Sequence, residues 1–216
     1  STGPALRTLT LRWAGEIPRG LTPAGAGQTL ASDTVRVRRV TDLAADYALP
    51  ASAARGGANL TPTLLIESAD PRVRAVAVQE TGGTPDPARA AELLAKAVHD
   101  RTTRRPEQGP PNARHTLESR RGDVNHLAEL YVALARSIGL PARTASGLLY
   151  VNGRFYVHAW AEVLLKDWVP VDPALGQFPA DAAHIRLATD RLARPMELTP
   201  QLGGVTITVL GTESER

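Results

Sequence analysis

The chain has 216 residues, of which 43% are hydrophobic and 22% charged, a composition typical of globular proteins that excludes a wholly disordered, collagen-like or coiled-coil chain. Its formal net charge is only +3, and its arginines are mixed with acidic residues rather than interleaved with aromatic ones, so we expect no nucleic-acid partner. Cysteine is absent, which excludes disulfides, cysteine-ligated metals and a thiol nucleophile.

The sequence predicts no membrane span in this chain, because no apolar run approaches the roughly 20 residues that a membrane-spanning helix needs. Ser1–Gly20 also lacks the basic start and apolar stretch of a signal peptide. An alternating strand pattern is already under way near the start of the sequence. We therefore expect the chain to be part of a longer protein.

Residues 1–68 alternate apolar and polar positions in short pieces, as in Leu9, Leu11 and Trp13. This period of two is typical of half-buried β-strands. The sequence therefore predicts a β-rich N-terminal segment over residues 1–68, followed by the main domain over residues 69–216.

Helical patterns follow in the first part of the main domain. We expect helices over Pro71–Gln79 and Asp86–Arg101, and a proline-containing loop over Arg104–Asn112. Gly122 can take the left-handed conformation that ends a helix, and Asp123 is a favourable N-cap for the next one.

The helix after Asp123 has the clearest pattern in the chain. Apolar side chains recur at helical spacing from its first residue, and Gly139 and Pro141 end it. The members of this stripe are Val124, Leu127, Tyr131, Leu134 and Ile138.

An antiparallel meander follows this helix. Asn152-Gly153 is a strong two-residue hairpin signal between strands at Arg143–Val151 and Arg154–Leu165. A third strand at Trp168–Asp172 contains Pro170, which indicates a sheet edge or a bulge. With a late strand expected over Val205–Leu210, a helix followed by an antiparallel meander predicts the α+β fold class.

Strand periodicity also places candidate functional side chains. Phe155, Val157 and every second residue after them form an apolar face, so His158 points to the other face. Asp172 ends the following strand. A helix N-terminus, a histidine and an aspartate are the layout of a helix-borne nucleophile served by a His/Asp pair. The alternative is a structural histidine held by hydrogen bonds.

Several segments, in the same order, strongly resemble the bacterial form of the transglutaminase-like superfamily, whose fold is papain-like. The resemblance is continuous from about Leu117 to Leu187 and looser from Pro71 to Leu210. The segments that carry it are Arg120–Arg136, which includes Arg-Gly-Asp-Val-Asn-His, Gly139–Arg143, Gly153–Val163, which includes His-Ala-Trp, Trp168–Pro173 and Gly176–Asp181.

The resemblance implies a catalytic site that has lost its nucleophile. The family's catalytic cysteine directly follows Gly-Asp, its histidine opens His-Ala-Trp, and its aspartate precedes a proline; the corresponding residues here are Val124, His158 and Asp172. Trp160 is expected to form a wall of the substrate groove, although an aromatic side chain in a strand is more often part of the packing. A valine side chain has no lone pair with which to attack an amide carbonyl.

Three functions remain open on this sequence. The first is an inactive pseudoenzyme that binds a peptide or protein segment in the former active-site groove. The second is a thiol acyl-transferase, amidase or cysteine protease, acting on glutamine side chains or peptide bonds, in which the cysteine has been replaced. The third is a structural module, in which Val124 is simply a core residue. The resemblance also favours a location outside the cytoplasm, within a longer exported bacterial protein.

No cofactor and no metal site are predicted. His126 and Glu129, three residues apart on the helix, could join His158 and Asp172 as metal ligands. A helix-face histidine and a carboxylate-paired strand histidine explain the same residues without a metal. We take His184 as a structural residue.

Overall fold

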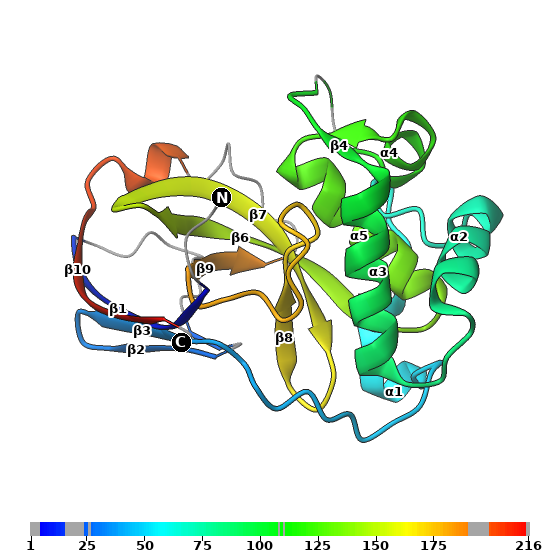
Figure 1. Ribbon diagram of the computed structural model, residues 1–216, viewed down its shortest axis with the longest axis horizontal. Coiled ribbons are helices and arrows are strands. Elements are labelled where there is room, and N and C mark those ends of the chain that lie inside the picture. Colours follow the sequence, from blue (N-terminus) through cyan, green and yellow to red (C-terminus); the bar gives the residue numbers. More distant parts are fainter. Residues whose placement is uncertain are drawn as a thin grey trace. The chain divides into compact units, whose positions relative to one another are not determined.

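The computed structural model describes residues 5–15, 24–25, 27–107, 109, 111–189 and 199–214 (Figure 1). The chain forms two compact units: unit 1 comprises residues 1–41, 145–159 and 180–216, and unit 2 comprises residues 42–144 and 160–179. Neither unit is a continuous stretch of sequence. Their bounds differ from the predicted boundary at residue 68, because strands from both ends of the chain pair in unit 1.

Unit 1 contains a four-stranded antiparallel sheet in the order β10-β1-β3-β2. Its strands are β1 (Leu6–Ala14), β2 (Gln28–Ala31), β3 (Thr34–Arg38) and β10 (Thr206–Ser214). The alternation that predicted the first strands is confirmed, since Leu9, Leu11 and Trp13 are buried. They pack in one core with residues of the later strands, including Leu148 and Ile185.

The β-rich character of the N-terminal segment ends at Arg38. Residues 42–60 contain no β-branched side chain, and they form instead the short helix α1 (Ala53–Gly56) and the 3-10 turn η1 (Gly57–Leu60). Strand propensity is therefore lost well before the predicted end of the segment.

Besides the short α1, unit 2 contains four longer helices: α2 (Pro71–Thr81), α3 (Pro87–Arg101), α4 (Ala113–Ser119) and α5 (Val124–Ser137). Helix α5 contacts each of the other three. Each helix has a side-chain cap at its start, from Asp70, Asp86, Asn112 and Asp123 respectively. These caps accept hydrogen bonds from N–H groups that have no partner inside the helix. The predicted helices are confirmed.

The structure corrects the role expected of Gly122. The left-handed residue that ends α4 is Arg120, with φ of 56°. Gly122 instead lies in β5 (Arg121–Gly122), which pairs in parallel with β4 (Thr103–Arg104). A Cβ atom at Gly122 would lie 2.4 Å from the Cβ of His126. Close approach of the backbone, not a left-handed backbone angle, therefore requires glycine here.

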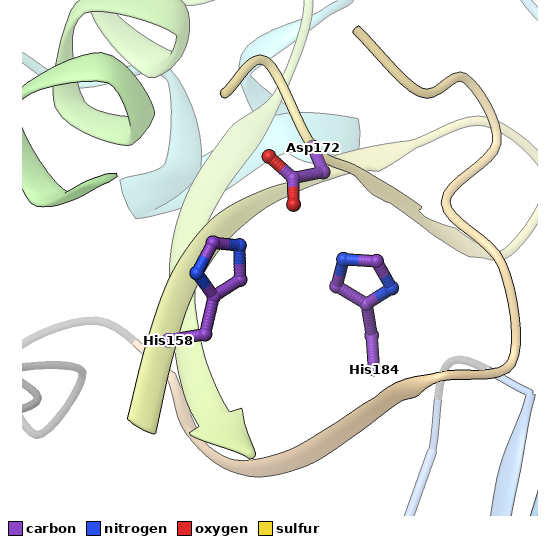
Figure 2. Close-up of side chains that lie close together, drawn as sticks. All are labelled: His158, Asp172 and His184. Carbon is purple, nitrogen blue, oxygen red and sulfur yellow. The ribbon is translucent and has the colours of Figure 1, made fainter. Parts of the chain in front are cut away.

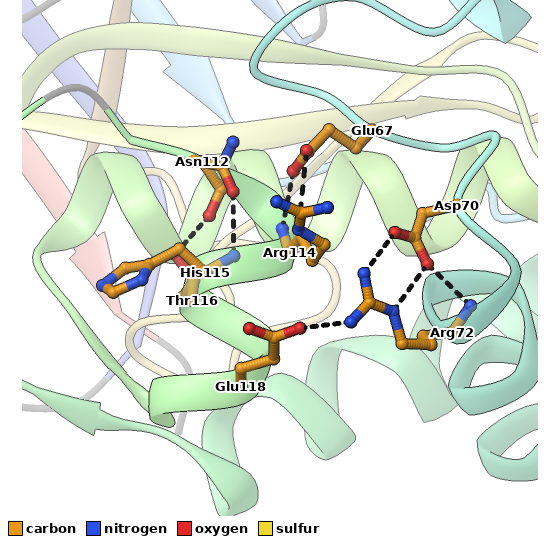
Figure 3. A network of polar contacts seen from close by, with 8 residues as sticks. All are labelled: Glu67, Asp70, Arg72, Asn112, Arg114, His115, Thr116 and Glu118. Carbon is orange, nitrogen blue, oxygen red and sulfur yellow. Dashed lines mark hydrogen bonds and ion pairs between the residues drawn. The ribbon is translucent and has the colours of Figure 1, made fainter.

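A polar network ties the start of α2 to α4 within unit 2 (Figure 3). Arg72 donates to Asp70 at 2.9 Å and to Glu118 at 2.6 Å. The backbone N–H of Arg114 donates to Glu67 at 2.9 Å. This network fixes the helix that leads, through β5, into the N-terminus of α5.

A second sheet has the strand order β8-β7-β6-β9. Its strands are β6 (Ala142–Val151), β7 (Arg154–Leu164), β8 (Trp168–Val171) and β9 (His184–Thr189). Asn152 and Gly153 both have positive φ, 49° and 80°, which confirms the predicted hairpin turn. Pro170 lies on β8, an edge strand, where a missing N–H is tolerated.

The strand β7 departs from simple alternation in its second half. Every residue from His158 to Val163 is buried, so both faces of the strand are covered there. The helices and antiparallel sheets confirm the α+β fold class. None of the helices described is long and apolar enough to cross a membrane.

Candidate active site

The N-terminus of α5 is a tightly capped turn. The Asp123 carboxylate accepts hydrogen bonds from the backbone N–H of Asn125 at 2.8 Å and of His126 at 3.2 Å. The same oxygen lies 2.8 Å from Nδ1 of His126, whose ring is buried. Asp123 therefore caps the helix and orients this histidine, so His126 is explained without a metal.

Val124 is the first residue of α5 and is only partly buried. It is not among the buried residues of the helix, which begin at His126. The interpretation of Val124 as a simple core residue is therefore weak. A hydrocarbon side chain stands, partly accessible, where the resemblance places a catalytic sulfur.

Asp172 directly follows β8 and is completely buried. Its Oδ1 accepts hydrogen bonds from the backbone N–H of Ala174 at 2.8 Å and of Leu175 at 3.1 Å. Its backbone pairs with Gln177 in an isolated antiparallel bridge. The loop after β8 thus fixes the orientation of this carboxylate.

His158 lies on β7 and is only 5% exposed. Its ring centroid is 5.8 Å from that of His184, the first residue of β9. Both histidines belong to unit 1. The sequence placed His158 on the face opposite the apolar residues; in the structure that face is covered as well, so His158 is buried and a second buried histidine lies beside it.

The His184 ring is oriented by the turn before β9. Its Nδ1 lies 3.2 Å from Oδ1 of Asp181 and 3.1 Å from the Asp181 carbonyl oxygen. Burial raises the pKa of the Asp181 carboxyl. The hydrogen bond from His184 and its charge, together with the backbone N–H groups of Leu6 and Ala183, lower this pKa more strongly. The pKa of Asp181 therefore lies below its usual range. With Nδ1 facing Asp181, the Nε2 atom of His184 faces away from that aspartate.

The side chains of His158 on β7, of Asp172 just after β8 and of His184 at the start of β9 lie close together (Figure 2). Strand β8 pairs with β7 through Val171 and Ala161, next to Asp172. One potential ligand atom from each of the three residues lies within 4.8 Å of the other two. Two imidazoles and one carboxylate are donor types found in zinc and non-haem iron sites. Among the described residues, these three, and not His126 with Glu129, could hold a metal ion.

Trp160 is almost completely buried, with 1% of its surface exposed. Such burial favours the packing interpretation of this residue, and its role in substrate binding stays a prediction. Its neighbour Glu162, also buried, forms an ion pair of 2.7 Å with Arg143, whose guanidinium stacks 3.8 Å from the ring centroid of Trp168. This cluster links β6, β7 and β8, the strand that Asp172 directly follows.

Sequence reasoning missed the place of His184 in this cluster. A usable signal was the spacing Asp181-Ala-Ala-His184, in which a carboxylate three residues before a strand orients a histidine at its first position. The arrangement of Val124 relative to His158 and Asp172 stays a prediction, as do the catalytic roles that the resemblance assigns to these positions.

Comparison with known proteins agrees with the resemblance. Residues 74–173 match the family described as the Transglutaminase-like superfamily, and this range includes Val124, His158 and Asp172. No curated protein matches the chain.

Eleven chains of solved structures match this chain, and two of them are compared below. A candidate cysteine protease from Cytophaga hutchinsonii aligns with a TM-score of 0.58 and 14% identity, over 98% of this chain and 86% of that one. The periplasmic domain of TgpA from Pseudomonas aeruginosa aligns with a TM-score of 0.47 and 15% identity, over 82% of this chain and 89% of that one. At such low identity the first likeness shows a shared fold, which confirms the predicted papain-like, transglutaminase-like class.

Proposed function

We propose that this chain, whose residues 74–173 belong to the transglutaminase-like superfamily, is a catalytically inactive member that binds a peptide or protein segment where active relatives hold their substrate. The observation that carries the proposal is Val124 at the first position of α5, directly after the capping Asp123. The residues around Val124 resemble the family motif, and the resemblance assigns the catalytic cysteine to this position.

Inactivity follows from the chemistry of the replacement. Valine has no lone pair with which to form an acyl intermediate, and His158 loses the thiolate that would be its counter-ion. Dismantling the catalytic triad of subtilisin lowers kcat by about 10⁶ and leaves about 10³- to 10⁴-fold acceleration over water, from binding and oxyanion stabilisation. A remnant of this size would be too slow for a useful enzyme.

Retention of a binding surface is supported by the elements around Val124. The N-cap, the close approach at Gly122 and the buried ring of His126 hold the first turn of α5 in place. Val124 itself is partly exposed. An apolar contact at this turn can receive a side chain of a bound segment without any chemical step.

The inactivity is tested with the native chain and Val124→Ala. We expect both to show the same background rate in two assays, hydrolysis of an activated ester and incorporation of an amine into a glutamine-containing peptide. Val124→Ala is a matched control because it keeps an apolar residue at the same position. Activity of the native chain clearly above that of Val124→Ala would contradict the proposal.

Binding is tested by selecting a peptide from a random library and measuring its affinity by calorimetry. Val124→Trp should weaken that peptide at least about tenfold by filling the apolar contact, while Val124→Ala should change its affinity by much less. Trp160 is unsuitable for this test because its replacement would open a cavity in the core. Failure to select any peptide, or equal affinity for both variants, would count against the binding proposal.

A second candidate is an enzyme whose cysteine has been replaced, and the close approach of the His158 and Asp172 side chains favours it. Val124→Cys tests it directly. If the catalytic arrangement persists, the new thiol should have a lowered pKa, react rapidly with iodoacetamide at neutral pH and release a burst of product from an activated ester. An alkylation rate like that of an ordinary surface thiol would show that the arrangement has been lost, as expected for a long-standing pseudoenzyme.

A further inference from the structure

The outer face of the four-stranded sheet of unit 1 carries a groove that none of the functions above uses. Its volume is about 400 Å³, within the range of about 300 to 1,000 Å³ that is usual for ligand sites. Arginine and threonine side chains dominate its wall. The lining residues are Arg7, Thr8, Thr10, Arg36, Arg38, Arg39, Thr41 and Glu213.

Strand register explains why these side chains gather on one face. In the pairing of β1 with β3, Thr8 lies opposite Arg38 and Thr10 lies opposite Arg36. The alternate residues, such as Leu9 and Val37, are buried in the core, so the threonines and arginines face outward. Both of these outward-facing pairs between β1 and β3 are polar.

Arg7 joins the groove although it is next to Thr8 in sequence. Neighbouring residues of a regular strand face opposite sides of a sheet. The pairing of β1 with β10 shifts register between Leu6 and Thr8. A bulge of this kind lets consecutive side chains approach the same face, and it adds a further cation to the groove.

On the β10 side the groove is open. Gly211 pairs with Thr10, and a Cβ atom at Gly211 would meet no other atom within 4 Å. A ligand that lies along β1 and β3 can therefore extend past this position. Glu213, opposite Thr8, is the acidic residue of the lining.

The groove concentrates positive charge. Four arginines and one glutamate line it, an excess of three positive charges that equals the net charge of the whole chain. Arg36 and Arg38 are exposed, and within the described part of the chain neither forms an ion pair. Arg12, also exposed on this face, lies 3.4 Å from Asp33 and is not part of the lining.

We propose that this groove binds an acidic peptide segment in extended conformation, with carboxylates at alternate residues. Guanidinium groups bind carboxylates through paired, charge-assisted hydrogen bonds. Alternate residues of an extended peptide are roughly 6.6 to 6.8 Å apart, which is also the spacing of Arg36 and Arg38 along β3. The threonine hydroxyls can donate further hydrogen bonds. The lining contains no aromatic side chain, so it lacks the stacking platform on which single-stranded nucleic acids depend.

The test uses the full chain and a synthetic peptide in which glutamate alternates with serine. We expect measurable affinity at low salt that falls as salt is added, because the contacts are exposed ion pairs. The double variant Arg36→Gln with Arg38→Gln should bind at least about tenfold more weakly. Arg12→Gln is the matched control, since it removes an arginine from the same face but not from the groove, and it should bind like the native chain.

Unfolding curves and amide NMR spectra show whether each variant is folded, and peptide-induced shifts of the Thr8, Thr10 and Arg36 amides locate the bound peptide. Equal loss of affinity in Arg12→Gln would overturn the proposal, because it would indicate a general charge effect. Stronger binding of an oligothymidylate than of the peptide would reassign the groove to nucleic acid. Inorganic phosphate that binds as tightly as the peptide would reduce it to a small-anion site. Absence of peptide binding at low salt would refute the proposal outright.

Discussion

Removal of the Asp123 side chain should destabilise the protein more than the loss of an ordinary helix cap. Asp123 accepts two backbone N–H groups and also contacts the buried ring of His126. Loss of an N-cap costs about 1 kcal/mol, and a buried polar group left without a partner costs about 1 to 3 kcal/mol more. We therefore expect Asp123→Ala to lower the free energy of unfolding by about 2 to 4 kcal/mol.

Helix α3 provides the matched control. Asp86 caps α3 in the same way, by accepting from the N–H groups of Ala88 and Arg89, and has no histidine contact in its cap. Asp86→Ala should therefore cost only about 1 kcal/mol. Asp123→Asn, which keeps a capping acceptor, should fall between the two alanine variants.

Urea unfolding followed by circular dichroism measures these differences as shifts of the midpoint at constant slope. On thermal unfolding, each kcal/mol corresponds to about 2 to 4 °C for a chain of this size. If Asp123→Ala costs no more than Asp86→Ala, the contact with His126 contributes nothing, and the first turn of α5 is held by the cap alone.

Three further predictions concern stability. Gly147→Ala should lower the free energy of unfolding by about 3 kcal/mol or more, because the added Cβ would lie 1.9 Å from the carbonyl oxygen of Ile185. Gly204→Ala is the control: its added Cβ would meet no atom within 4 Å, so it should be nearly neutral in the same urea titration. The pKa of Asp181 is lowered in the folded protein, so its stabilising contribution should be complete above the unfolded pKa of about 3.9 and be lost as pH falls through the folded value. Asp181→Asn should remove this part of the acid-induced loss of stability. An unchanged acid profile in this variant would contradict the prediction. Burial raises the pKa of Tyr47 from its usual value of 10.0 to about 12, so stability should fall as pH rises from 10 toward 12. Tyr47→Phe should flatten that alkaline slope.

Local signals in the sequence were sufficient for the parts of the fold that local physics determines. Asp123 caps the helix that was predicted to start after it, and Asp86 caps the helix that was predicted to start at Asp86 itself, because an N-cap acts on N–H groups two or three residues away. Asn152-Gly153 forms the predicted turn because its positive φ angles depend on the two residues themselves. Such features need no knowledge of distant segments.

Features that depend on distant segments were not predictable in the same way. Gly122 is a different case, because its role is set nearby: the close approach of His126, four residues later, requires glycine, and Arg120 occupies the left-handed position. His184 gains its place in the candidate site only when β9 pairs with β6. The two units could not be found from the sequence either, because each combines segments from different parts of the chain.

The pairing of β1 with β10 has a consequence for how the protein acquires its structure during synthesis. The first strand described needs the last one described as a neighbour, so one edge of β1 stays open until residues 206–214 have left the ribosome. Contacts so far apart in sequence also form slowly. Helices α2 to α5 of unit 2, whose partners are close in sequence, can assemble earlier, and the interval before β10 arrives is when the nascent protein is most exposed to aggregation.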